Sequence, residues 1–254
     1  MTDFIKNTRI ILVNPSHPGN IGSVARAMKN MGFNKLYIVS NNQHYLSGEA
    51  RARAGHAVDL LEQATQRVSL ESALAECKLI FGCSGRTPDL PLPCLDPKEL
   101  AECLLKQAYQ NTQNAIVLGC ERVGLSVKDL ALCHYQVKIP AHQDYVSLNL
   151  SHALQIIVYE CFCLQNNAKK HSIQENVEAD LATFEEMSYF YEHLERVITK
   201  TKFYDPKNPG RLLPRLRLLF NRVLMSAKEV NMLRGFLTSI EEFYKTKMKN
   251  STKL

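Results

Sequence analysis

Five short apolar runs, separated by segments with helical spacing, constrain the fold of this 254-residue chain more than any other feature. The runs are rich in Ile, Leu and Val, as are strands buried on both faces. They are RIILV (9–13), KLYIV (35–39), KLIFGC (78–83), AIVLGC (115–120) and YQVKI (135–139). Helical candidates lie near 21–31, 49–63, 70–76, 97–109, 127–133 and 150–165. This alternation predicts an α/β fold with a mainly parallel sheet.

The pattern changes after residue 165. Residues 166–179 are polar and have no apolar period, so they predict a linker between a first domain, 1–165, and an extension, 180–254. Apolar residues of the extension recur every three or four positions over 184–198, 216–223 and 230–244, a spacing typical of amphipathic helices. We therefore expect a small all-helical domain after the α/β domain.

Positive charge is concentrated in the second part of the chain. Residues 1–160 hold 15 basic and 14 acidic residues, whereas the segment 196–234 alone holds 10 basic and 2 acidic residues. An arginine-rich patch suits bidentate contacts with phosphate groups and indicates a nucleic-acid partner. The alternative is a solvated basic face.

Cysteine spacing and hydropathy argue against two other classes of protein. None of the eight cysteines forms a Cys-x-x-Cys pair, so the sequence does not predict a zinc ribbon or finger, and we expect reduced, mostly buried thiols. No apolar run approaches the ~18 residues of a membrane span, and we find no secretory signal. We expect a cytoplasmic protein with no membrane partner.

Three polar segments, 14–32, 118–126 and 145–155, lie at strand exits or helix entries. Ligands bind at the carboxyl ends of the strands in open α/β sheets, so these segments are expected to converge on one cleft. Each alone is also explained by ordinary turns and helix caps. Gly19 and Gly22 are wrongly spaced for a dinucleotide loop, which argues against a nicotinamide-dependent oxidoreductase.

In order and wording, the three segments resemble the signature motifs of the SPOUT superfamily of S-adenosylmethionine-dependent RNA methyltransferases, and more narrowly its TrmH-like 2'-O-ribose branch. The matching stretches are SHPGNIGSVARAMKNMG, LGCERVGL and SLNLSHALQIIVYE. The stretch FYDPKNPGRLLPRLRLLFNRV is similar to the helical extension of a tRNA-modifying member. The resemblance implies a SPOUT fold with a C-terminal deep trefoil knot over roughly 115–165, a homodimer, and S-adenosyl-L-methionine as cofactor.

The resemblance also implies site residues. Those expected to act in catalysis are Arg26, Asn20, Glu121, Ser147 and Asn149. Those expected to bind the cofactor are Ser84, Gly119, Glu121, Ile139, Ser147, Leu148 and Asn149. Those expected to bind RNA are Arg26, Arg211, Arg215, Arg217 and Arg222. Cys120 departs from the family pattern, where many relatives have Arg, and His17 is expected to be non-catalytic.

The function implied is 2'-O-methylation of cytidine or uridine 32 in the anticodon loop of tRNA, with no metal required. The alternatives are a different tRNA or rRNA nucleotide, or a catalytically inactive RNA-binding relative. Arg26 is often proposed as the general base in this branch, but a guanidinium hardly ever deprotonates in a protein. We therefore expect Arg26 to orient a phosphate and stabilise the developing alkoxide, and Glu121 either to pair with Arg26 or to hold the motif loops in place.

Overall fold

The structure is a computed structural model that describes residues 3–41, 44–85, 92–107, 112–170 and 181–251. The chain divides into two compact units, Met1–Glu178 and Ala179–Leu254. Within the described ranges, no helix is both long enough and apolar enough to cross a membrane.

The first unit is built on a seven-stranded sheet in the order β3-β2-β1-β6-β4-β7-β5, and every pair of neighbours is parallel. The strands are β1 (Thr8–Val13), β2 (Lys35–Val39), β3 (Thr65–Arg67), β4 (Cys77–Cys83), β5 (Cys94–Leu95), β6 (Gln113–Leu118) and β7 (Tyr135–Val137). The prediction of an α/β fold with a parallel sheet is confirmed. The sequence missed β3 and β5, which are two or three residues long and contain no apolar run.

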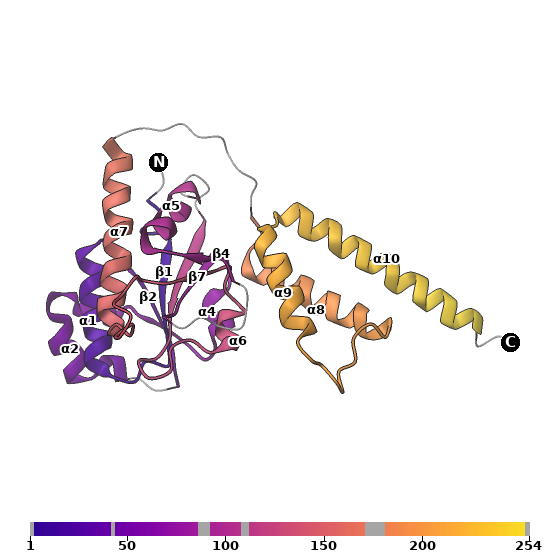
Figure 1. Cartoon of the computed structure of the whole chain (residues 1–254), viewed down its shortest axis with the longest axis horizontal. Helices are drawn as coiled ribbons and strands as arrows, with labels where there is room; N and C mark the ends of the chain where they lie inside the picture. Colours follow the sequence, from indigo (N-terminus) through magenta and orange to yellow (C-terminus); the bar gives the residue numbers. More distant parts are fainter. Residues whose placement is uncertain (1–2, 42–43, 86–91, 108–111, 171–180, 252–254) are drawn as a thin grey trace. The chain divides into compact units, whose positions relative to one another are not determined.

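Helices cover both faces of this sheet. Figure 1 shows α1, α2 and α7 on one face, with α4 and α6 on the other side, and α1 contacts both α2 and α7. The helices are α1 (Pro18–Asn30), α2 (Gly48–Ala54), α3 (Val58–Glu62), α4 (Leu70–Leu74), α5 (Pro97–Gln107), α6 (Val127–Leu130) and α7 (Leu150–Lys170). Two short 3₁₀ turns, His44–Leu46 and Gly55–Ala57, complete the set. The knot over roughly 115–165 stays a prediction of the family resemblance.

Several helix boundaries differ from the sequence-based expectation. α1 begins at Pro18 rather than near residue 21, because proline fits the first helical position, where its missing N–H is not needed. The single helix predicted over 49–63 is broken at Gly55, which ends α2 with φ +56°. α6 ends at Leu130 instead of continuing to 133.

The helix predicted over 150–165 also differs, because α7 continues five residues further, to Lys170, into the predicted linker. The strand predicted over 135–139 ends at Val137, so Ile139 lies in the loop that follows it. The rest of the predicted linker, 171–179, and the last two residues of the helix predicted over 97–109 lie outside the described residues.

The second unit is helical, as the sequence predicts. It consists of α8 (Phe184–Lys200), α9 (Leu212–Val223) and α10 (Ala227–Ser251). Reciprocal capping boxes open α8, through Thr183 and Glu186, and α10, through Ser226 and Glu229. Its core includes Phe190, whose ring packs edge-on to that of Phe220 with centroids 4.9 Å apart.

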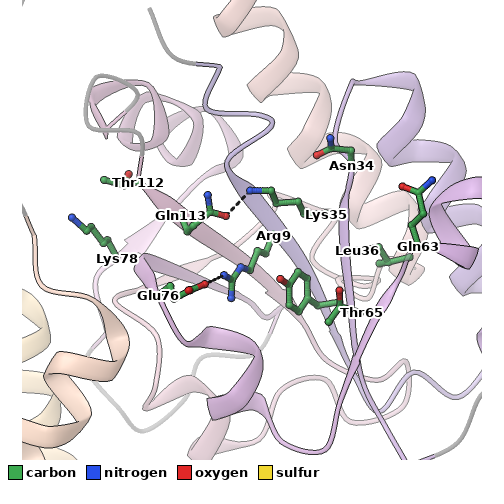
Figure 2. Close-up of a pocket in the computed structure, with 11 residues that line it drawn as sticks. Arg9, Asn34, Lys35, Leu36, Gln63, Thr65, Glu76, Lys78, Thr112 and Gln113 are labelled. Atoms are coloured by element: carbon green, nitrogen blue, oxygen red, sulfur yellow. Dashed lines mark hydrogen bonds and ion pairs between the residues drawn. The ribbon is translucent and has the colours of Figure 1, made fainter.

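Arg9 is a buried charge at the amino end of β1 (Figure 2). Its Nη1 donates to the carbonyl oxygens of Ala73, at 3.0 Å, and Ala75, at 2.7 Å. Its Nη2 donates to Glu76 Oε2 at 2.6 Å. The guanidinium therefore fastens the turn between α4 and β4 to the amino edge of the sheet.

Candidate active site

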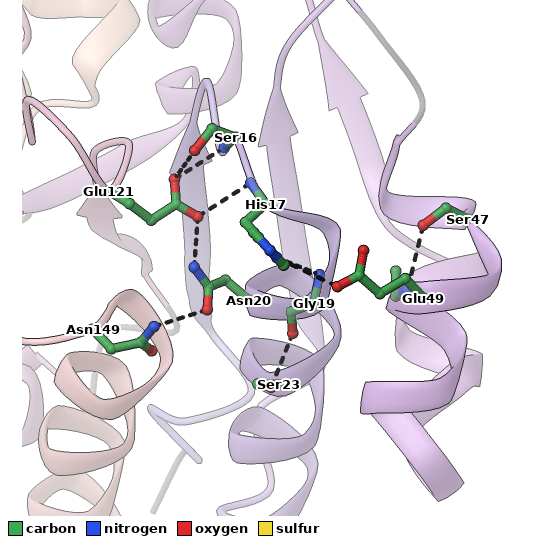
Figure 3. A network of polar contacts seen from close by, with 10 residues as sticks. Ser16, His17, Gly19, Asn20, Ser23, Ser47, Glu49, Glu121 and Asn149 are labelled. Carbon is green, nitrogen blue, oxygen red and sulfur yellow. Dashed lines mark hydrogen bonds and ion pairs between the residues drawn. The ribbon is translucent and has the colours of Figure 1, made fainter.

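The loops that follow β1 and β6 meet at the carboxyl edge of the sheet, because these strands are neighbours. Glu121, in the loop after β6, accepts hydrogen bonds on both carboxylate oxygens from the loop after β1 (Figure 3). Oε2 accepts from the Ser16 hydroxyl at 2.6 Å and from the Ser16 backbone N–H at 3.0 Å. Oε1 accepts from Asn20 Nδ2 at 2.8 Å and from the His17 backbone N–H at 3.3 Å. The second motif is thereby tied to the first.

Asn20 and Asn149 extend this network to the third motif. Asn149 Nδ2 donates to Asn20 Oδ1 at 2.8 Å (Figure 3). The other side-chain atom of Asn149, Oδ1, accepts from the hydroxyl and the backbone N–H of Ser151, at 2.7 and 2.9 Å, and so caps the first turn of α7. A continuous chain of hydrogen bonds therefore joins three segments that are far apart in the sequence.

The network fixes the charge state of Glu121. Partial burial by itself raises the pKa of this carboxyl group, but the hydrogen bonds from Asn20 and Ser16 outweigh it and lower the pKa to about 2. Glu121 is therefore ionised at neutral pH. A carboxylate with four donors already directed at it is a poor proton acceptor, so Glu121 is suited to positioning rather than to general base catalysis.

The start of α1 is held by His17 and by a close helix contact. His17 Nδ1 accepts a hydrogen bond from the Gly19 N–H at 3.2 Å, which caps α1. The same nitrogen lies 3.6 Å from Glu49 Oε1, which is too far for a hydrogen bond. One turn further on, a Cβ on Gly22 would lie 2.1 Å from the Ala50 carbonyl oxygen, so glycine permits the close packing of α1 on α2.

A half-open cavity of about 230 Å³ lies beside this network, at the carboxyl ends of β4, β6 and β7. Apolar side chains form much of its wall, among them Leu118, Val137, Ile139, Leu150 and Ala153. The backbone N–H groups of Ile139, Ser147 and Leu148 have no hydrogen-bond acceptor within the described part of the chain. The cavity thus combines apolar walls with free backbone donors, as a site for a flat heterocycle requires.

The loop from Gly119 to Gly124 forms one wall of the cavity and depends on its two glycines. The Gly124 N–H donates to the Cys120 carbonyl at 2.8 Å, and Gly124 has φ +69°. A Cβ on Gly119 would lie 2.1 Å from the carbonyl carbon of Gly124. A side chain at Gly119 would therefore push the loop open.

The structure brings most of the predicted cofactor residues together. Ser84, Gly119, Glu121, Ile139, Ser147 and Leu148 line the cavity. Asn149 does not line it, but lies next to it and contacts Asn20. Of the residues predicted to bind RNA, all but Arg26 are in the second unit. Arg211, Arg215 and Arg222 are exposed there, whereas the Arg217 guanidinium lies 4.5 Å from the centre of the Tyr191 ring.

Arg26 is exposed on α1 and makes no ion pair with Glu121. Of the two roles expected for Glu121, holding the motif loops is the one that its hydrogen bonds perform.

Ser16 is the residue of this network that the sequence did not single out. It makes the shortest contact with Glu121, yet a serine in a Pro-rich turn has no distinctive sequence signal. Its role follows only from the pairing of β1 with β6, which sequence periodicity does not determine.

Comparison with known proteins gives matches over both units. Residues 7–159 match the model of the SpoU rRNA Methylase family, and residues 185–252 match that of the C-terminal domain of the tRNA methyltransferase TrmJ. The chain is 42% identical over 243 residues to the tRNA (cytidine/uridine-2'-O-)-methyltransferase TrmJ of Sodalis glossinidius, covering 95% of this chain and 94% of that protein. It is 39% identical over 241 residues to the tRNA (cytidine/uridine/adenosine-2'-O-)-methyltransferase TrmJ of Pseudomonas aeruginosa, covering 92% and 93%.

Solved structures agree with this result. The crystal structure of TrmJ from Z. mobilis superimposes with a TM-score of 0.80 at 27% identity, covering 92% of this chain and 99% of that one. A probable methylase family protein from Haemophilus influenzae superimposes with a TM-score of 0.62 at 32% identity, covering 96% and 99%. The likeness therefore extends over both units of the chain.

Proposed function

The chain belongs to the SpoU rRNA methylase family and, within it, to the TrmJ tRNA 2'-O-methyltransferases, and from this membership we propose that it methylates the ribose of nucleotide 32 in the anticodon loop of tRNA. S-adenosylmethionine is the methyl donor. The observation that carries the proposal is the hydrogen-bond network that joins all three motif segments beside the apolar cavity.

The cavity fits S-adenosylmethionine by the chemistry of its wall. An adenine ring needs apolar contacts on its faces and hydrogen bonds at its edge, and the cavity offers both. Ile139, Ser147 and Leu148 would hold the adenine edge through their backbone N–H groups. The carbonyls and amides of the Gly119–Gly124 loop would hold the methionine end. No pyrophosphate is present in this cofactor, which accounts for the absence of a glycine-rich phosphate loop.

The chemical problem is to make a ribose hydroxyl attack a methyl group. Bound S-adenosylmethionine supplies that methyl already activated on a sulfonium. The protein must align the oxygen with the methyl carbon and the sulfur, and must let the hydroxyl proton leave. In the proposed mechanism, Asn20 and Asn149 fix the loops that present the ribose.

Arg26 then orients the adjacent phosphate and stabilises the alkoxide as it forms. Because a guanidinium keeps its proton and Glu121 stays ionised with its oxygens occupied, the proton leaves to a neighbouring group or water. Replacing Arg26 with Lys tests this role. We expect methyl transfer to fall while RNA affinity is kept, and an Arg26→Lys variant with near-normal transfer would contradict it.

The second unit is proposed to hold the tRNA at a distance from the target ribose. Arg211, Arg215 and Arg222 have the spacing of one face of α9 and are exposed, which suits contacts with a phosphate track. A chain ending after Lys170, where α7 ends, should bind S-adenosylmethionine normally and lose most of its tRNA affinity. Undiminished tRNA binding by that truncated chain would refute the role of this unit.

A second copy of the chain is proposed to cover an apolar face of α7. Ile156, Tyr159 and Phe162 recur every three residues and are 38%, 52% and 36% exposed. Tyr145 and Val146, in the loop before α7, are also exposed. We expect the chain to be a dimer in solution and Tyr159→Glu to make it monomeric, as measured by light scattering coupled to size-exclusion chromatography.

The decisive experiment maps 2'-O-methyl groups by mass spectrometry in tRNA from cells with and without this gene. We expect one methyl group, on nucleotide 32, to disappear. Purified protein should also methylate an unmodified tRNA transcript, but not the same transcript with a 2'-deoxy nucleotide at position 32. Transcripts with C, U or A at that position would define the base range, since the named relatives differ in it. Loss of a methyl group elsewhere, in tRNA or rRNA, would overturn the choice of nucleotide.

A further inference from the structure

A second cavity lies at the amino ends of the parallel strands, opposite the carboxyl ends that form the proposed active site. This amino-edge pocket is a cavity of about 600 Å³ whose wall includes Arg9, Lys35, Tyr37, Lys78, Thr112 and Gln113. These residues lie at or next to the amino ends of β1, β2, β4 and β6, whereas the active-site cavity is at the carboxyl ends. Figure 2 shows the side chains of Arg9, Lys35 and Gln113 gathered in the middle of the pocket.

The pocket is positively charged. Three cationic side chains line it, from Arg9, Lys35 and Lys78, and Glu76 is the single carboxylate among its described lining residues, which leaves a net charge of +2. Glu76 is already engaged by Arg9 at 2.6 Å. Lys35 donates to Gln113 Oε1 at 2.7 Å, and this partner carries no charge.

Burial and the neighbouring guanidinium of Arg9 both act on Lys35. Burial, followed by the charge of Arg9, lowers the pKa of this lysine from its usual value. An anion bound between Lys35 and Arg9 would offset the effect of Arg9 and raise the pKa of Lys35 again. Arg9 Nε is, in addition, a buried donor with no partner among the described residues.

Part of this arrangement is structural. Arg9 holds the carbonyls of Ala73 and Ala75, and its guanidinium lies 4.8 Å from the centre of the Tyr37 ring. These contacts explain why an arginine is buried at the start of β1. None of these contacts involves Lys35 or Lys78, which line the same cavity from two different strands.

We propose that the amino-edge pocket binds a phosphate group through Lys35 and Lys78, and that the positive charge of Arg9 adds to the attraction. Lysine suits this task as a mobile point charge, and the amide of Gln113 adds a neutral donor. The phosphate has two possible sources, a small phosphorylated molecule or the backbone of the tRNA. The second source rests on the proposed function, and the first does not.

The test compares the full chain with a Lys35→Gln/Lys78→Gln variant. Lys98→Gln/Lys106→Gln is the matched control, because these lysines are exposed on α5, outside the pocket, and their loss removes the same charge. Inorganic phosphate is added while backbone amide signals of residues 34–37 and 112–114 are followed by NMR. We expect saturable shifts in the wild type and the control, and at least tenfold weaker binding in the pocket variant.

A second arm identifies the source. tRNA affinity is measured for the three proteins over a range of salt concentrations. If the backbone of tRNA supplies the phosphate, the pocket variant binds tRNA about tenfold more weakly than the control does. The slope of log affinity against log salt concentration should then be smaller by about one for each lost phosphate contact. If a small molecule supplies it, tRNA binding equals that of the control while phosphate binding is lost.

Absence of saturable shifts at these amides in the wild type, or equal phosphate binding by both variants, would overturn the proposal. S-adenosylmethionine affinity is measured on the same samples and should be unchanged in both variants. Since that affinity tests the active site alone, failure of the pocket proposal and failure of the proposed function give different results.

Discussion

The two edges of the sheet each carry a charged side chain that fastens a distant loop, but with opposite signs. At the carboxyl edge, the Glu121 carboxylate accepts three hydrogen bonds from the loop after β1 and a fourth from Asn20 at the start of α1. At the amino edge, the Arg9 guanidinium donates to two carbonyls and one carboxylate of the turn before β4. The same device thus connects loops at both ends of the strands.

The difference lies in what surrounds each charge. Beside Glu121 the cavity is lined mainly by apolar side chains and backbone groups, which suits a bound cofactor. Around Arg9 two further cations remain, which suits an anion. A fixed charge alone therefore does not mark a site for chemistry, because the groups that surround it decide what the cavity can bind.

The largest expected effect is on methyl transfer, in a Glu121→Gln variant. The side-chain NH₂ group of the new glutamine would face N–H and O–H groups that donate to Glu121 in the wild type. The link between the first and second motifs would therefore break. Misplacement of reacting groups by about 1 Å reduces rates on the order of 100-fold, and we expect a loss of that size in the rate of tRNA methylation. Glu102→Gln, on the exposed side of α5, is the control and should be fully active. A fully active Glu121→Gln variant would show that the link is dispensable.

Loss of the guanidinium at the amino edge should instead affect stability. Arg9→Met removes three hydrogen bonds, one of them to a charged partner, and should lower the free energy of unfolding by about 2–3 kcal/mol. S-adenosylmethionine affinity should not change, since Arg9 is at the opposite edge from the cavity. Urea unfolding followed by circular dichroism measures the first quantity and calorimetry the second. Arg53→Met, an exposed arginine of α2, is the matched control.

A result that contradicts this contrast would be an Arg9→Met protein of normal stability with weakened cofactor binding. It would mean that the two edges are coupled through the sheet and do not act separately.

The two edges also differ in how far the sequence predicted them. The strand–helix alternation predicted the parallel sheet, and the family resemblance predicted six residues that line the cavity. Ser16 and the amino-edge pocket were not predicted. Both depend on strand order, because residues such as Arg9 and Lys35 become neighbours only when β1 pairs with β2. Hydrophobic periodicity indicates that a strand exists but not which strand lies beside it.

The free energy of unfolding, measured over a range of pH, tests the lowered pKa of Glu121. The pKa of Glu121 is lowered to about 2, so its stabilising contribution is complete above the usual value of 4.5 and is lost as the pH falls from 4.5 toward 2. The difference in free energy of unfolding between wild type and Glu121→Gln should therefore shrink by about 1 kcal/mol between pH 6 and pH 3, a figure reduced for the partial exposure of this group. A pH-independent difference for Glu121→Gln would contradict the lowered pKa.

The smallest expected effect comes from removing one hydroxyl. Ser16→Ala deletes the 2.6 Å contact with Glu121 but keeps the backbone N–H of residue 16, so the carboxylate retains three donors. We expect a loss of about 1 kcal/mol in stability and at most a tenfold loss in methyl transfer. The Ser16→Ala/Glu121→Gln double variant should be no less active than Glu121→Gln, because the two residues act through one contact. Additive losses would mean that Ser16 contributes to transfer by a second route, through a direct contact with the RNA.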